Sequence, residues 1–213
     1  MAVSLKKGQG VSLKKSDNDL SLVTIGLGWD IKAEKKGFLS RIFSKSDPEY
    51  DLDVIAFLCN SNGKVVDVGR DSTGNATLKD GDIIFFNSMR HKSGHIWSTG
   101  DNRTGEGDGD DEQIIVKLNE LSNDYSKIVF VIQIYEGVNR KQDFGKVNNP
   151  YIRAIDNKNK ELVRFDLSGG GQFQDCRSML FAELNREDGG WKFDAIGSPS
   201  SSDSFTSWLK KYM

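Results

Sequence analysis

The sequence predicts an all-β protein, a β-sandwich of two packed, mainly antiparallel sheets with a short C-terminal helix and loop insertions. Apolar segments of strand length recur along the chain with turn residues between them, and no long helical pattern intervenes. The 22 glycines and three prolines are typical of a strand-and-turn protein. A chain of 213 residues can bury a sizeable core without needing disulfides or metals for its stability.

The first strands are predicted from a short repeat and a glycine motif. VSLKK at 3–7 returns at 11–15 with glycines between, which predicts a hairpin. Residues 20–28, LSLVTIGLG, predict a further strand, and we interpret GLGWD at 26–30 as a turn closed by Asp30.

Two later segments carry the clearest strand signals. Residues 50–58, YDLDVIAFL, alternate so that Asp51 and Asp53 share one face of the strand. Residues 127–135 are apolar on both faces, which places this strand centrally in a sheet. Shorter strands are expected at 82–87, 113–118, 151–156, 162–167, 178–184 and 191–196.

We expect one sandwich domain over residues 1–197, interrupted by an insertion at 32–49. Within the insertion, KKGFLSRIFSK at 35–45 has four cations and helically spaced apolar residues. Such a segment can lie on an anionic membrane surface, dock on a partner, or fold back on the parent domain. Residues 198–213 are expected to form a Ser-rich linker and a closing helix that docks on the sandwich, capped by Ser202 or Asp203.

The composition argues for a reduced cytoplasmic setting. Cys59 and Cys176 match no metal-binding spacing, so we expect free thiols that are buried or half-buried. Residues 1–13 lack the apolar core of a signal peptide, and the longest apolar stretch, 128–135, is too short to span a bilayer.

Charge is distributed unevenly along the chain. The formal net charge is −2, yet residues 100–112 carry six acidic side chains against Arg103, which is −5 and leaves +3 for the rest. Because no basic field dominates, we expect no nucleic-acid binding.

The acidic segment 100–112, GDNRTGEGDGDDE, predicts a metal site. Its alternating glycines allow a tightly shaped loop, and five carboxylates fall within positions 106–112. Crowded carboxylates need a counter-charge, and calcium takes about 6–8 oxygen ligands from carboxylates, amides and carbonyls. Zinc is a poor match because the loop has no imidazole or thiolate, whereas magnesium stays open. The spacing is not that of an EF-hand, and a solvated acidic loop without metal is the alternative.

Several motifs resemble those of the bacterial TerD family of tellurite-resistance and stress proteins. The resemblance runs from about residue 3 to 197, and the acidic segment is its most specific part. The matching elements are GLGWD at 26–30, DLDVIAFL at 51–58, IIFFN at 83–87, GDNRTGEGDGDDE at 100–112 and RKQDFGKVNNPYIR at 140–153.

The resemblance implies a calcium-binding sandwich, with two ions per chain, in a tellurite-, phage- or colicin-resistance context. It implies a binding or scaffold module in the cytoplasm or peripheral to the inner membrane, acting with other stress-response or membrane-associated proteins, and neither an enzyme nor a binder of small-molecule substrates. The metal-ligand candidates that it carries over are Asp30, Asp51, Asp53, Asp101, Asn102, Glu106, Asp108, Asp110, Asp111 and Glu112.

Two other functions remain as alternatives. A carboxylate-dependent hydrolase could use Asp51 and Asp53 as general acid and base, although no leaving-group donor is evident. Direct binding of a toxic oxyanion is opposed by the sign of the acidic loop. His91 and His95 would need two further ligands to form a zinc site, so we expect exposed loop histidines.

Overall fold

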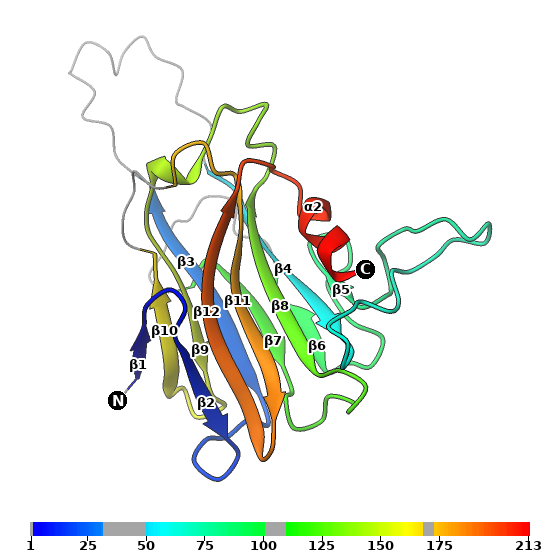
Figure 1. Ribbon diagram of the computed structural model, residues 1–213, viewed down its shortest axis with the longest axis vertical. Coiled ribbons are helices and arrows are strands. Elements are labelled where there is room, and N and C mark those ends of the chain that lie inside the picture. The colour runs from blue at the N-terminus through cyan, green and yellow to red at the C-terminus, as the bar shows by residue number, and fades with distance from the viewer. Residues whose placement is uncertain (1, 32–49, 101–109, 168–172) are drawn as a thin grey trace.

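The computed structural model describes residues 2–31, 50–100, 110–167 and 173–213, and within these ranges two six-stranded sheets pack face to face (Figure 1). Among the described residues, every pair of neighbouring strands is antiparallel except β1 with β10. In spatial order, sheet A contains β1 (Val3–Leu5), β10 (Glu161–Asp166), β9 (Val147–Ile155), β3 (Val23–Ile31), β7 (Glu112–Val116) and β6 (Ile96–Ser98). Sheet B contains β2 (Gly10–Lys14), β12 (Gly190–Ser200), β11 (Ser178–Glu187), β8 (Lys127–Ile134), β4 (Leu52–Cys59) and β5 (Ile83–Ile84). The predicted β-sandwich is therefore confirmed.

The centre of sheet B is buried on both faces. In β4, Val54, Ala56 and Leu58 belong to the main core between the sheets, whereas Ile55 and Phe57 belong to a second cluster on the outer face. That outer face is covered by the C-terminal segment, where Phe205, Trp208 and Leu209 of the second cluster are buried. Two covered faces explain why the β4 and β8 sequences are apolar at nearly every position.

The closing helix docks as predicted, although its boundaries differ. It consists of α2 (Thr206–Leu209) followed by the 3₁₀ turn η3 (Lys210–Tyr212); another short 3₁₀ turn, η1 (Phe144–Lys146), precedes β9. The N-cap is Phe205, which makes no side-chain capping bond, so the expected cap at Ser202 or Asp203 is wrong. Strand β12 continues to Ser200, so the first residues of the expected linker are strand residues.

Two local predictions about the N-terminal half are wrong. The repeated VSLKK segments do not form a hairpin with each other, because β1 pairs with β10 in sheet A and β2 with β12 in sheet B. GLGWD is not a turn, because β3 runs through it to Ile31, with a register shift between Gly28 and Asp30.

In the described ranges, no helix is long and apolar enough to cross a membrane. The predicted basic segment 35–45 lies outside those ranges.

Candidate functional site

The best-defined candidate site lies where one edge of sheet B is incomplete. Strand β5 pairs only with Ala56 and Phe57, so it stops short of the first residues of β4. There the Val54 N–H donates to Glu112 Oε2 of β7 at 2.5 Å, instead of to a neighbouring strand. One carboxylate of sheet A thus satisfies a backbone donor of sheet B and joins the two sheet edges.

Asp53 is held in place by its cross-strand neighbour. Gln133, directly opposite on β8, donates from Nε2 to Asp53 Oδ2 at 3.0 Å. The Gln133 Oε1 atom in turn accepts the Phe205 N–H at 2.8 Å. A buried amide therefore connects the carboxylate of Asp53 to the start of the C-terminal helix.

Asp53 and Glu112, each only 5% exposed, line one pocket of about 210 Å³. The pocket has a polar wall and an apolar rim, and its polar residues all offer oxygen atoms. Its lining consists of Asp53, Val54, Phe86, Asn87, Met89, Ser98, Gly100 and Glu112. Carboxylate, amide and hydroxyl oxygens are the ligands that calcium and magnesium prefer.

Asp111 and Asp110 anchor the C-terminal end of the acidic segment to sheet A. The Asp111 side chain accepts the Trp29 N–H at 3.0 Å, and its own N–H donates to the Leu27 carbonyl. The Asp110 side chain is fully buried and lies 2.7 Å from Arg153 Nε. Asp110 is therefore engaged by a protein cation, which gives it a structural role.

The glycines of GLGWD make room for this anchoring. A Cβ at Gly26 would come within 2.6 Å of Asp110 Oδ1, and one at Gly28 within 2.6 Å of the Tyr151 ring. The Tyr151 hydroxyl also donates to Asp110 Oδ1, at 3.1 Å. The motif thus allows two side chains from distant segments to cross strand β3 closely.

The other candidate ligands lie elsewhere in the structure or outside the described residues. Asp51 precedes β4 and lies beside Arg140, with 3.8 Å between Oδ2 and Nη1. Asp30 is in β3, and only its backbone is described. Across the described part of the chain, no group of three or more His, Cys, Asp or Glu side chains is arranged to hold a metal ion. Four candidates fall outside the described residues, namely Asp101, Asn102, Glu106 and Asp108.

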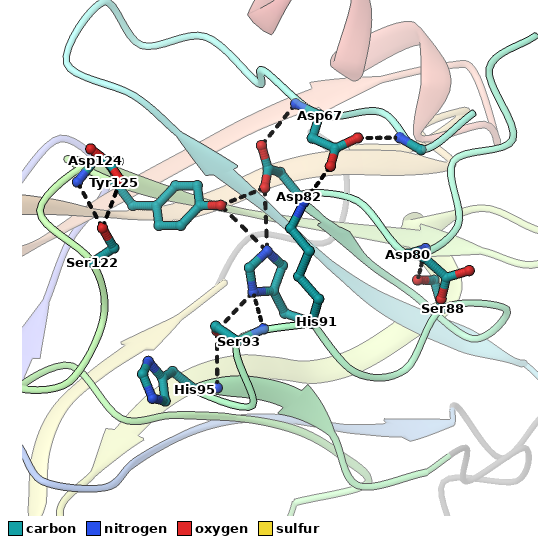
Figure 2. Close-up of polar contacts among 12 residues, drawn as sticks. Asp67, Asp80, Asp82, Ser88, His91, Ser93, His95, Ser122, Asp124 and Tyr125 are labelled. Carbon is teal, nitrogen blue, oxygen red and sulfur yellow. Dashed lines mark hydrogen bonds and ion pairs between the residues drawn. The ribbon is translucent and has the colours of Figure 1, made fainter. Parts of the chain in front are cut away.

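A second polar cluster, which the sequence analysis missed, is buried beside β5 (Figure 2). The side chains of Asp82 and His91 are each 2% exposed, so the expectation that His91 is an exposed loop residue is wrong. Asp82 Oδ1 accepts the Tyr125 hydroxyl at 2.7 Å and lies 3.3 Å from His91 Nε2. The Asp67 N–H donates to the other oxygen, Oδ2, at 2.9 Å.

The bonds of His91 fix its tautomer. Its Nδ1 accepts the Ser93 N–H at 3.1 Å, so in the neutral ring Nε2 carries the proton and donates to Asp82. Burial alone would raise the pKa of Asp82, but hydrogen bonds from His91, Tyr125 and the Asp67 backbone outweigh it and hold this pKa below its usual value. For Tyr125, burial first and the bond to Asp82 second raise the pKa above its usual value. The cluster ties two loops together as a satisfied polar network.

The thiols are free, as expected. Cys59 is buried and Cys176 is partly exposed. Burial raises the pKa of Cys59 to about 12, so it is present as the inert thiol.

Comparison with known proteins connects these features to a family. A family model described as the TerD domain matches residues 1–212. The chain is 68% identical to tellurium resistance protein TerX of Serratia marcescens over the full length of both chains. It is 35% identical to stress response protein SCP2 of Bacillus subtilis, again over the full length of both.

A solved structure shows the same fold. It is that of a homologue of telluride resistance protein (TerD) from Streptomyces coelicolor A3(2), with a TM-score of 0.59 and 21% identity. The match covers 87% of this chain and 94% of the other.

Proposed function

Since this chain belongs to the TerD domain family, we propose that it is a calcium-binding protein of the tellurium-resistance and stress-response type that acts by binding partner proteins. The observation that carries the proposal is the convergence of Asp53 and Glu112, one from each sheet, on a single pocket. Two carboxylates that share a pocket offer a divalent cation the oxygen ligands that it prefers. The ion would supply positive charge and link the two sheet edges.

The donor chemistry fits the ion. Asn87 and Ser98 contribute neutral oxygens to the same pocket. Gly100 and Glu112, which lie at the two ends of the acidic segment, both line the pocket. The family resemblance implies two ions per chain, and we assign one of them to this pocket.

A role without catalysis agrees with the remaining geometry. The hydrolase alternative needs Asp51 and Asp53 to face one substrate, but Asp51 lies beside Arg140 and Asp53 lines the pocket. In the buried cluster, His91 Nδ1 lies 2.8 Å from the Ser93 hydroxyl and 3.1 Å from the Ser93 backbone nitrogen, but the His91 side chain is only 2% exposed, which leaves little access for a substrate. The names of the matched relatives refer to resistance and stress and to no reaction.

Calorimetric titration of chelator-treated protein with calcium tests the proposal, with magnesium and zinc titrations for comparison. We expect saturable calcium binding and a higher melting temperature in calcium, because a ligand that binds only the folded state stabilises it. Asp53→Asn should weaken binding at one site at least tenfold. Asp188→Asn, in the exposed turn between β11 and β12, is the matched control and should bind as the wild type does. Absence of saturable binding by calcium and magnesium would refute the proposal.

A further inference from the structure

Strand β2 leaves one edge of sheet B open. It is the outermost strand, with β12 on one side and, among the described residues, no strand on the other (Figure 1). The Lys15 N–H donates to the Gly189 carbonyl of the facing chain. Bonded and non-bonded positions alternate along an antiparallel pair, so the backbone groups of Gly10, Ser12 and Lys14 point away from β12. All three residues are exposed, and such an edge is a template for a further strand.

The two faces of β2 have different chemistry. On the inner face, Leu13 is buried and Val11 packs against the main core while staying partly exposed. On the outer face, the Ser12 hydroxyl donates to Glu187 Oε2 at 2.7 Å. A strand added at this edge would therefore cover Val11 on one face and meet polar side chains on the other.

Charge is distributed asymmetrically along the same edge. At one end, the carboxylate of Asp194 occupies the space that a Cβ of Gly10 would take. This carboxylate is held by Lys192 at 2.8 Å and by Asn185 at 2.9 Å. At the other end, Lys14 presents a cation. An antiparallel copy of β2 would bring its own Lys14 to the end that carries Asp194.

From this edge we propose that two copies of the chain associate through β2, antiparallel and symmetric about Ser12. Ser12 then lies opposite Ser12 of the second copy, and these two residues exchange both backbone hydrogen bonds. Lys14 lies opposite Gly10 of the second copy, and its N–H donates to that glycine carbonyl. The Lys14 carbonyl already accepts the N–H groups of Asp17 and Asn18, so the pairing ends at this residue.

The side chains select this register over its neighbours. A shift of one residue would place the apolar face of one strand beside the polar face of the other. A pairing centred on Lys14 would place two ammonium groups opposite each other, which is destabilising. The pairing about Ser12 instead puts each Lys14 near a carboxylate and each Val11 beside a Leu13. Lysine on an edge strand opposes pairing with other strands, so the same charge favours this one partner.

The interface is small, since β2 has only five residues, so we expect weak and reversible association. Analytical ultracentrifugation of the full chain tests the proposal, in chelator so that the result does not depend on the proposed calcium site. We expect a dimer with a Kd of about 10–500 μM. Lys14→Glu puts a second carboxylate beside Asp194 of the other copy and should weaken the dimer at least tenfold. Lys79→Glu, in the exposed loop before β5 at the opposite edge of sheet B, is the matched control and should stay within twofold of wild type.

Two substitutions at Ser12 test the backbone pairing and its symmetry. Ser12→Pro removes an N–H only on the open side, so it should abolish the dimer while thermal unfolding shows a folded chain. Ser12→Cys, with Cys176→Ser to remove the partly exposed thiol, places two sulfurs across a pair whose Cα atoms are about 5.5 Å apart. Oxidised glutathione should then link the dimer by thiol–disulfide exchange, and Lys14→Glu should suppress the link.

Two results would overturn the inference. A chain that stays monomeric at about 1 mM would leave the edge to a strand of another protein. A dimer that Lys14→Glu does not weaken would have its interface elsewhere. Should Ser12→Pro fail to fold, the Lys14→Glu measurement and the disulfide link still decide the question.

Discussion

The fully buried carboxylate of Asp110 lies 2.7 Å from the guanidinium of Arg153, on the outer face of sheet A. The Arg153 side chain is 23% exposed and also reaches Glu161, with 3.0 Å between Nη1 and Oε2. This ion pair fixes Asp110 against β9 and β3. Asp110 is followed directly by Asp111 and then by Glu112, which lines the pocket.

Arg153→Met should destabilise the protein strongly, because it leaves the carboxylate of Asp110 buried without its cation. Loss of one partner of a buried pair costs about 3–5 kcal/mol, and we expect the lower end because Arg153 is partly exposed. Urea unfolding measures the loss, and Lys192→Met, which breaks a pair 41% exposed on the lysine side, is the control. The double variant Arg153→Met with Asp110→Asn should recover part of the stability; no recovery would contradict the assigned role.

Gly26→Ala should destabilise the fold because the new methyl group would overlap the carboxylate of Asp110, which its partners prevent from moving. Overpacking of this kind costs about 1–3 kcal/mol. Thermal unfolding of Gly26→Ala, Asp110→Ala and the double variant forms a cycle. The cost of Gly26→Ala should be smaller when Asp110 is already alanine, and strict additivity would rule out the steric explanation.

Tyr125→Phe removes the 2.7 Å bond to Asp82 from the buried cluster. A hydrogen bond to a charged group contributes about 1.5–3 kcal/mol, so the free energy of unfolding should fall by about that amount. Tyr135→Phe, at a ring 36% exposed, is the matched control and should change stability by less than about 0.5 kcal/mol. Equal effects of the two substitutions would show that the Asp82 bond contributes nothing.

The lowered pKa of Asp82 predicts an acid-dependent loss of stability. A carboxyl whose folded pKa lies below its unfolded value of about 3.9 stabilises the fold fully above that value. This contribution is lost as the pH falls through the folded pKa, because the native state must then take up the proton. In Asp82→Asn the free energy of unfolding should be lower at neutral pH and should fall less steeply below pH about 4. An acid limb as steep as that of the wild type would assign the pH dependence to other carboxyls.

Alternating polar and apolar residues, and continuous apolar runs, correctly predicted the strands whose side chains are buried on one or both faces of a sheet. The segments expected at 50–58 and 127–135 are β4 and β8 to within two residues, because their side chains must match two covered faces. The hairpin predicted from the VSLKK repeat is wrong because the two strands pair with distant segments, β1 with β10 and β2 with β12. The sequence next to each repeat does not encode these partners.

The site was predictable only in part. Asp53 and Glu112 were candidates because of their residue type and family motif, and the structure brings both to one pocket. Glycine locally favours a turn, whereas the role of Gly26 inside strand β3 depends on its close approach to Asp110, which is far away in sequence. His91 lies between Arg90 and Lys92 and has no local signal of burial; its distant partners are Asp82 and Tyr125.

The double role of Glu112 predicts that two substitutions at this position will behave differently. Its Oε2 accepts the Val54 N–H, which joins the sheets, and its charge faces the pocket. Glu112→Gln keeps an acceptor oxygen but loses the charge, so the melting temperature without metal should change little while calcium affinity falls at least tenfold. Glu112→Ala removes both and leaves the buried Val54 donor without this partner, which should cost about 1–3 kcal/mol in addition. Thermal unfolding in chelator and calorimetric calcium titration of both variants separate the two roles. Equal loss of stability in the two variants would mean that the charge, and not the acceptor, holds the sheet edges together.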